Sequence, residues 1–452
     1  ERGRETEFEE IHGYHLEQAV RYRRELGPLD DHGRDLARRA AAKLASAGTR
    51  ALDRSDMPAA ANLLRRANDL LDVGDPARLE LVPDLGEALM ALSRSDEAAE
   101  LLGPAHQAAT ELGDRRLAGR IRLRQLTLEL VGGGAEDASA LAETETLRTS
   151  LLDLGDHGGA ARAWRVLSLV HANAGRYDDM AEAAEQMMEE GTASGEESLV
   201  RQGATVYAVA GVVGTTPVPV ALATCERSLG EVAGDRWAEA LVCGALARLR
   251  AMQGDFGEAR TMYRREMSLL ADLGVSRESA STSIDSARVE ILAGDLAAAE
   301  AHLRRDDAQL AELGERYFRS TVAGMLGQVL LLRGDPAEAE AFVVLAEALA
   351  ESDDTWSQVL WRSARARLLA ETAPDRALAL AQGAVDLAEE TADLVLHGDA
   401  RADLGEVELA TGRPDAARTS FERALTLYER KGDTTSAARA RHRLGSLARA
   451  AE

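Results

Sequence analysis

The chain has 452 residues and a formal net charge of −24, which argues against a nucleic-acid-binding surface because neutralising phosphates requires clustered Lys and Arg. Apolar residues make up 45% of the sequence and aromatic residues only 4%, so a core must be built mainly from Ala and Leu. No run of about 18 apolar residues occurs, so we expect no membrane contact through a spanning helix.

The N-terminal stretch, residues 1–28, is predicted to be a linking helix. Its apolar residues have loosely helical spacing, and the helix ends at Gly27-Pro28 because proline disfavours helical geometry in the residue before it. The sequence begins with Glu1 rather than Met, so we expect it to be a piece of a longer protein.

From residue 29 to 432 a pattern of about 40 residues repeats. The turns Gly254-Asp255, Gly294-Asp295 and Gly334-Asp335 each precede an Ala-rich helical stretch. Alignment on the preceding turn places a marker, usually small, in the first turn of each second helix: Ala60, Ala98, Ala138, Met180, about Pro219, Ala259, Ala299, Ala339, Ala377 and Ala417. Such a period indicates a solenoid, because one helix pair cannot bury its own apolar face.

Two further series support this interpretation. Small residues recur inside the first helices, where a neighbouring helix would cross: Gly86, Ser168, Ala247, Ala287, Gly327, Gly405 and Gly445. Glycines that suit helix C-termini recur between repeats: Gly74, Gly113, Gly155, Gly195, Gly234, Gly274, Gly314 and Gly432. We therefore predict an all-α, right-handed superhelical solenoid of about ten antiparallel helix pairs, followed by a capping helix over residues 433–452.

Two repeats are irregular in sequence. Gly132-Gly133-Gly134 replaces a tight turn, and the segment from Gly211 to Pro219 contains two prolines. We interpret both as length drift in a surface turn, and the alternative is a hinge or a bend in the superhelix.

Residue patterns of catalysis and metal binding are absent from the sequence. Neither lysine, Lys43 or Lys431, has the glycines of a phosphate-binding loop, and the zinc, calcium and Gly-x-Ser-x-Gly patterns are missing. His12 and His15 have metal-ligand spacing but no third ligand. We predict no enzyme activity, no cofactor and no metal. For Cys225 and Cys243, two buried thiols in the cytoplasm are favoured over a disulfide.

The turn followed by an Ala-rich helix resembles the tetratricopeptide repeat, with Trp164, Leu167, Ser168 and Tyr177 near that family's positions. The standard unit has about 34 residues. The longer helices here are similar to the sensor arm of LuxR/MalT-type STAND signalling ATPases. The segments Glu9–Ala19, Leu26-Gly27-Pro28 and Ala47–Ala51 resemble the junction between such an ATPase and its repeat array. The parent would carry an adenylate or guanylate cyclase domain or a helix-turn-helix.

This resemblance implies that the first helix of each pair lines a concave groove. The groove residues are then Arg165, Leu169, Gly244, Arg248, Ile284, Arg288, Gly324 and Gln328. Arg248 and Arg288 would form a cationic ladder that selects an acidic peptide, a carboxylate or a phosphate. The aromatic residues Trp237, Tyr317, Trp356 and Trp361 either pack between repeats or line the groove.

The predicted function is a non-catalytic sensor or interaction domain. It would bind a protein or peptide partner, or a small effector, in the groove and relay binding to its own upstream ATPase module. The alternative is a passive scaffold for protein assembly or self-association.

Overall fold

The computed structural model describes residues 2–72, 75–92, 94–131, 137–273 and 282–451. Gly74, Gly132-Gly133-Gly134 and Gly274, which the sequence marks as turn residues, lie outside the described residues. The chain divides into two compact units. Unit 1 comprises Glu1–Val170 and Gln186–Val200, and unit 2 comprises His171–Glu185 and Arg201–Glu452.

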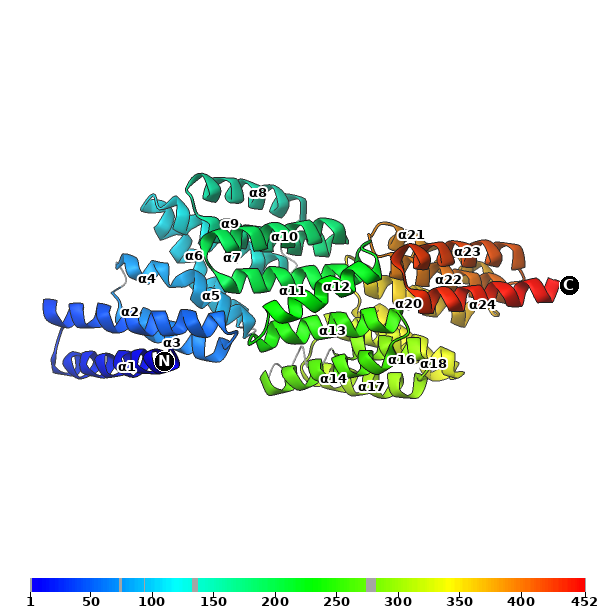
Figure 1. The fold of residues 1–452 in the computed structure, drawn as a ribbon, viewed down its shortest axis with the longest axis horizontal. Helices are drawn as coiled ribbons and strands as arrows, with labels where there is room; N and C mark the ends of the chain where they lie inside the picture. Colours follow the sequence, from blue (N-terminus) through cyan, green and yellow to red (C-terminus); the bar gives the residue numbers. More distant parts are fainter. Residues whose placement is uncertain (1, 73–74, 93, 132–136, 274–281, 452) are drawn as a thin grey trace. The chain divides into compact units, whose positions relative to one another are not determined.

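The described residues are helical throughout, with helices joined by short turns (Figure 1). In chain order unit 1 begins with α1 (Arg2–Leu26), α2 (Asp31–Asp53), α3 (Met57–Leu70), α4 (Pro76–Glu80), α5 (Val82–Ala91), α6 (Ser95–Glu111), α7 (Arg115–Val131) and α8 (Asp137–Asp153). The chain continues through α9 (His157–Asn173), α10 (Tyr177–Ser194) and α11 (Glu197–Val213).

The remaining helices belong to unit 2. They are α12 (Val218–Glu231), α13 (Arg236–Met252), α14 (Phe256–Leu273), α16 (Ser283–Ala293), α17 (Leu296–Glu312), α18 (Tyr317–Arg333), α19 (Pro336–Leu349), α20 (Thr355–Leu369), α21 (Pro374–Glu389), α22 (Leu394–Ala410), α23 (Pro414–Lys431) and α24 (Thr434–Ala451). No strand occurs in the part of the chain that the structure describes. The predicted fold class, an all-α superhelical solenoid of antiparallel helix pairs, is confirmed.

The turn inside each regular pair follows directly from its Gly-Asp sequence. Gly294 and Gly334 end α16 and α18 in the left-handed conformation, with φ of 82° and 83°. The aspartates that follow cap the next helices: Asp295 accepts a hydrogen bond from the amide of Ala298, and Asp335 accepts one from the amide of Glu338. The two residues thus end one helix and start the next.

The marker positions in the second helices are buried where the two helices of a pair meet. Ala60, Ala98, Ala259, Ala299, Ala339, Ala377 and Ala417 are all 0% exposed. The predictions for Ala138 and Pro219 are wrong, because both residues are exposed. Ala140 and Ala221, two positions later, are buried instead, at 2% and 1%.

The error comes from aligning on the preceding turn rather than on the start of each helix. Ala221 lies four residues after Pro217, the N-cap of α12, just as Ala299 lies four after the N-cap Asp295. The residue that approaches the partner helix is therefore fixed by the helix start. The irregular segment before Pro217 moves that start by two positions.

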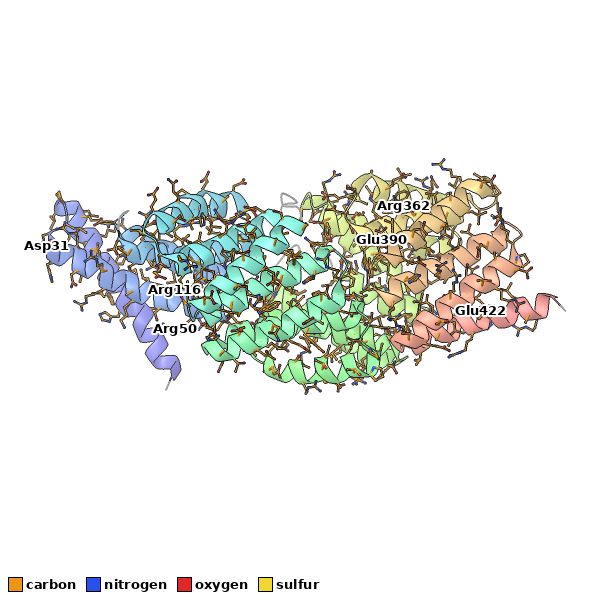
Figure 2. The ribbon with its side chains drawn as sticks, turned by 90° about the horizontal axis from the view of Figure 1, so that it is seen from above. Asp31, Arg50, Arg116, Arg362, Glu390 and Glu422 are labelled. Carbon is orange, nitrogen blue, oxygen red and sulfur yellow. The ribbon has the colours of Figure 1, made fainter. Side chains whose placement is uncertain are left out.

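The side chains on the outer faces of the helices are mostly charged. Glu390 and Glu422, labelled in Figure 2, are exposed to solvent. The core lies between the helices of each pair and between neighbouring pairs, as in the cluster that Ala299, Leu303, Leu326 and Leu330 form in unit 2.

Replacing Gly405 by Ala tests the close helix contact. A Cβ atom at Gly405 would lie 2.9 Å from Cζ of Phe421, a buried ring on α23. We expect Gly405→Ala to lower the free energy of unfolding by about 1 to 3 kcal/mol, as overpacking does. Urea denaturation followed by circular dichroism measures this.

Gly383→Ala is the matched control, because a Cβ atom there would meet nothing within 4 Å. We expect this variant to be more stable than the parent by about 0.5 to 1 kcal/mol, since Ala is the better helix former. Equal effects of the two substitutions would contradict a tight contact at Gly405.

Candidate ligand-binding cavity

In unit 1 a buried cluster of ion pairs joins the first helices of three successive repeats, α5, α7 and α9. Glu87 of α5 contacts Arg124 of α7, and its other carboxylate oxygen accepts a hydrogen bond of 2.7 Å from Arg165 of α9. Burial by itself would raise the pKa of Glu87, but Arg124 and Arg165 lower it to about 2. Burial lowers the pKa of Arg124 to about 10. The first helices of unit 1 therefore converge on one inner face, and Arg165 is committed to a structural ion pair.

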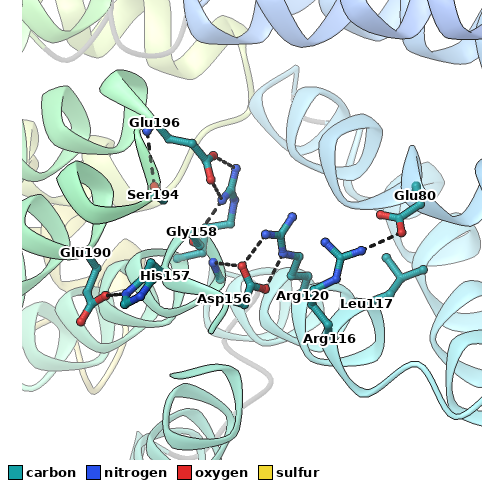
Figure 3. Close-up of polar contacts among 12 residues, drawn as sticks. Glu80, Arg116, Leu117, Arg120, Asp156, His157, Gly158, Glu190, Ser194 and Glu196 are labelled. Carbon is teal, nitrogen blue, oxygen red and sulfur yellow. Dashed lines mark hydrogen bonds and ion pairs between the residues drawn. The ribbon is translucent and has the colours of Figure 1, made fainter. Parts of the chain in front are cut away.

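Successive repeats of unit 1 are also linked by polar contacts, drawn in Figure 3. Arg116 donates to Glu80 at 2.8 Å, and Arg120 donates from Nε to Asp156 at 2.7 Å. Nδ1 of His157 lies 2.7 Å from Glu190. Arg120 and Asp156 are 36 residues apart, close to one repeat, so the contact joins neighbouring first helices.

Asp156 belongs to a series of buried aspartates that cap first helices. One oxygen of each accepts a hydrogen bond from a backbone amide of its own helix: Gly159 for Asp156, Ser357 for Asp354, and Val395 and Leu396 for Asp393. The second oxygen accepts from the first helix one repeat earlier: Arg120 Nε at 2.7 Å, Ser320 Oγ at 3.1 Å and Trp356 Nε1 at 3.1 Å. These aspartates start a helix and bind two repeats together.

Unit 2 contains a cavity of about 260 Å³ on its inner face. Five successive first helices (α13, α16, α18, α20 and α22) contribute to its wall, and α23 and α24 complete it. Its charged and hydrogen-bonding residues are Arg248, Arg288, Gln328, Arg367, Asp399, Asp403, Glu406, Tyr428, Asp433, Ser436, Arg439 and Arg443. Three residues that the sequence assigns to a groove, Arg248, Arg288 and Gln328, thus lie in one cavity wall.

Most of the charges in the cavity are paired with one another. Arg288 contacts Asp399 at 2.9 Å, and the Tyr428 hydroxyl donates to the same carboxylate at 2.7 Å. Arg367 contacts Asp403 at 3.3 Å. Burial raises the pKa of Asp403 to about 6, with neighbouring carboxylates adding to the effect.

Arg248 is the least well paired arginine of the cavity. Its Nε atom is buried and has no hydrogen-bond partner among the described residues, and its ion pair with Asp285 spans 3.6 Å. The guanidinium carbon lies 5.5 Å from the ring centroid of Trp356, which Arg288 approaches from 5.6 Å. Burial lowers the pKa of Arg248.

Gly244 stands one turn before Arg248 on α13. A Cβ atom there would lie 2.6 Å from Oε1 of Glu266 and 3.0 Å from Oδ2 of Asp285, so only glycine lets these two carboxyl groups approach α13. Burial raises the pKa of both Glu266 and Asp285.

The structure places the other candidate residues outside the cavity. Trp356 donates to Asp393 behind the two arginines. Trp361 is 8% exposed and packs against Ala323 and Ala346, so it occupies a packing position between repeats rather than the cavity wall. Ile284 and Leu169 are partly buried beside core clusters. Gly324 faces Leu360, Trp237 is half-buried and Tyr317 is 55% exposed.

The sequence did not lead us to predict the acidic half of the cavity wall. Asp399, Asp403 and Glu406 are spaced by four and three residues, so they share one face of α22. Their partners lie far away in sequence, as in the 111 residues between Arg288 and Asp399. In a strongly acidic chain such spacing alone does not separate a cavity wall from a solvated face.

α23 and α24 complete the cavity wall because the C-terminal repeat contacts residues that lie 147 to 220 positions earlier in the chain. The Lys431 ammonium donates to the carbonyls of Gly211, Gly214 and Thr216 at 2.7 to 2.9 Å. The irregular segment after α11 is therefore a docking site for the C-terminal repeat. Lys431 is 0% exposed, and burial lowers its pKa to about 8.

Neighbouring contacts extend this closure. Thr434 and Thr435 donate to the carbonyls of Met252 and Ala251 at the end of α13, at 3.1 and 2.9 Å. Gln253 donates to the carbonyl of Gly432 at 2.6 Å. Arg439 donates to Leu292 near the end of α16 at 3.1 Å. The start of α24 accordingly lies beside the end of α13 (Figure 1).

The described residues contain no group of three or more side chains placed to hold a metal ion, and no described helix is long and apolar enough to cross a membrane. Cys225 and Cys243 are both free and buried. Burial raises the pKa of the Cys225 thiol to about 12 and of the Cys243 thiol to about 11, so both stay protonated at neutral pH.

These features define an all-α repeat protein of the tetratricopeptide-like class with a cavity that charged and apolar side chains line. No family model matches the sequence, and no curated protein is similar to it. The fold is similar to a Rap protein solved in complex with Competence and Sporulation Factor, at 11% identity and a TM-score of 0.52, over 82% of this chain and 98% of that one.

Two further solved structures have lower scores. The apo quorum sensor NprR from B. thuringiensis matches at 12% identity and a TM-score of 0.49, over 77% of this chain and 98% of that one. An IFIT1 monomeric mutant matches at 13% identity and a TM-score of 0.46, over 96% and 94%. At such identities the likeness concerns the fold alone.

Replacing Lys431 by Met tests the closure of unit 2. The substitution keeps the aliphatic bulk but leaves three buried carbonyls without their donor, so we expect a loss of about 3 kcal/mol in unfolding free energy. Arg430→Met, at the exposed neighbouring position, should change stability by less than about 0.5 kcal/mol. Chemical denaturation of both variants measures the difference.

The pH dependence of the free energy of unfolding provides an independent test of the buried Lys431. The pKa of Lys431 is about 8 in the folded protein and near 10.5 when unfolded, so the unfolded state binds more protons between these values. The Lys431 contribution to stability therefore increases as pH rises from 8 to 10.5. The stability difference between parent and Lys431→Met should grow over that range, and a constant difference would contradict a lowered pKa of Lys431 in the folded protein.

Proposed function

We propose that this chain is a non-catalytic binding domain whose ligand, a protein or peptide partner or a small effector, contacts the cavity of unit 2. The observation that carries this proposal is the convergence of five first helices and α24 on one cavity with a mixed charged and apolar wall. A concave site with a few convergent polar groups is the usual form of a ligand pocket. That a Rap protein of similar fold was solved with a bound factor supports the same reading.

We also propose that binding is relayed to an ATPase module joined N-terminally, as in the signalling ATPases that the sequence resembles. A ligand that touches both α13 and α24 favours the closed arrangement of unit 2, and a change in that equilibrium is what a neighbouring module senses. Both a cyclase-linked and a helix-turn-helix parent fit this role. The two buried, unpaired thiols fit a cytoplasmic protein.

A thermal-shift titration with acidic peptides, nucleotides and oligosaccharides tests the proposed binding function. A true ligand at a hundredfold excess over its Kd stabilises the folded state by about 2.7 kcal/mol and raises Tm. We expect acidic peptides to do so. Arg248→Glu combined with Arg288→Glu should abolish the shift, because both substitutions reverse charge in the cavity wall.

Arg264→Glu is the control, since it makes the same charge change at an exposed position on α14. Ala402→Leu fills the cavity without altering its charges and should also abolish the shift, which separates occupancy from loss of folding. Circular dichroism confirms that each variant is helical. An unchanged Tm with every ligand class, together with self-association in light scattering, would favour a passive scaffold instead.

A further inference from the structure

Asp433 has one carboxylate oxygen without a partner. Its Oδ1 accepts a hydrogen bond of 2.9 Å from the amide of Ser436, and thereby caps α24. Its Oδ2 is buried and has no hydrogen-bond partner among the described residues, although Asp433 is 1% exposed and lies in the cavity wall. A buried carboxylate oxygen without a donor is costly and calls for a group that the protein itself does not supply.

The repeat explains why the donor is missing. In Asp354 and Asp393 the second oxygen is taken by Ser320 and Trp356, which lie 34 and 37 residues earlier. Trp356 lies two residues after its N-cap Asp354, and Ser320 lies four after its N-cap Arg316. The equivalent residues of α22, counted from its N-cap Asp393, are Val395, which is apolar and 3% exposed, and His397, whose Nε2 lies 3.2 Å from Glu389. Among the described residues no donor from α22 therefore reaches Oδ2 of Asp433, and Asp433 belongs to the cavity wall.

Arg248, on α13, shows the complementary feature in the same cavity wall. Arg288, one repeat later at the equivalent place, has a close carboxylate partner at 2.9 Å. Arg248 has only the 3.6 Å contact with Asp285 and an Nε atom without a hydrogen bond among the described residues. A guanidinium held against a tryptophan face in this way is oriented to donate two hydrogen bonds to one carboxylate.

We propose that the cavity binds a small zwitterion, a free aliphatic amino acid or a short aliphatic peptide, with its carboxylate on Arg248 and its ammonium group on Asp433. This inference rests on the proposed binding function and names its ligand chemistry. The volume of about 260 Å³ suits one or two residues, and Met252, Ile291, Leu292 and Leu332 provide an apolar wall for their side chains.

The charge balance of the wall favours a zwitterion over a simple ion. A phosphate or another plain anion would face four carboxylates: Asp399, Asp403, Glu406 and Asp433. A plain cation would face five arginines: Arg248, Arg288, Arg367, Arg439 and Arg443. A ligand that carries both charges avoids both repulsions.

Isothermal titration of the full chain with leucine and leucyl-leucine tests the proposal. N-acetylation of either probe removes the ammonium group, and C-terminal amidation removes the carboxylate. We expect each modification to weaken binding at least tenfold. Asp433→Asn should weaken the unmodified probes at least tenfold and leave the acetylated probes unaffected, because their contact to Asp433 is already gone.

Arg248→Gln should behave in the mirror-image way, with no further effect on the amidated probes. Asn is a good N-cap, so Asp433→Asn keeps the start of α24, and circular dichroism verifies it. Arg264→Gln, exposed on α14, is the control and should leave all affinities unchanged. Each substitution loses its effect on the matching blocked probe only if the substituted side chain and the blocked ligand group contact each other directly.

The possible results separate this inference from the proposed function. Equal binding of blocked and unblocked probes, or of parent and variants, overturns the zwitterion inference, and so does the absence of binding by every probe. If acidic peptides still raise Tm and that shift is lost in Ala402→Leu, the binding function stands without a zwitterion site. If neither experiment gives a signal, both proposals fail.

Discussion

The cavity of unit 2 depends on how the last carbonyl groups of α11, α13 and α16 are satisfied. A helix end leaves about four carbonyls without an intrahelical donor, and a buried end must find donors elsewhere. Here Lys431, Thr434, Thr435 and Arg439 supply them from the C-terminal repeat. A solenoid whose repeats contact only their neighbours would leave α24 apart from α13. These capping contacts instead turn α24 into a wall of the cavity.

The repeat of about 40 residues determines how the helices around these contacts pack. In most second helices a buried alanine four residues after the helix start lets the two helices of a pair approach, and a buried aspartate at the start of several first helices links that helix to the previous repeat. Rules of this kind are repeated because each repeat solves the same packing problem. A position that breaks them without loss of packing is then informative, since natural sequences tend to break local rules at functional sites. Asp433, whose Oδ2 has no hydrogen-bond partner among the described residues, is such a position.

The fold was accessible from the sequence because its signals are local. Gly-Asp turns and buried alanines recur within each repeat, and the errors at Ala138 and Pro219 arose only where an irregular turn shifted the helix start. The cavity was accessible in part, through the spacing of Arg248, Arg288 and Gln328. Its acidic wall and the role of Lys431 were not, because contacts such as Lys431 with Gly211 span 220 residues and no local pattern encodes them. The two prolines after Gly211 marked the docking segment as irregular without indicating what it binds.

The closure and the candidate ligand contacts occupy the same short stretch of chain. Lys431 binds the segment after α11, the carbonyl of Gly432 accepts from Gln253, and Asp433 lines the cavity. A ligand held between Asp433 and Arg248 would tie α24 to α13 through one more pair of contacts and so add to the same closure. Because a ligand shifts a conformational equilibrium by its difference in affinity for the two states, occupancy of this cavity and closure of unit 2 are then one coupled equilibrium.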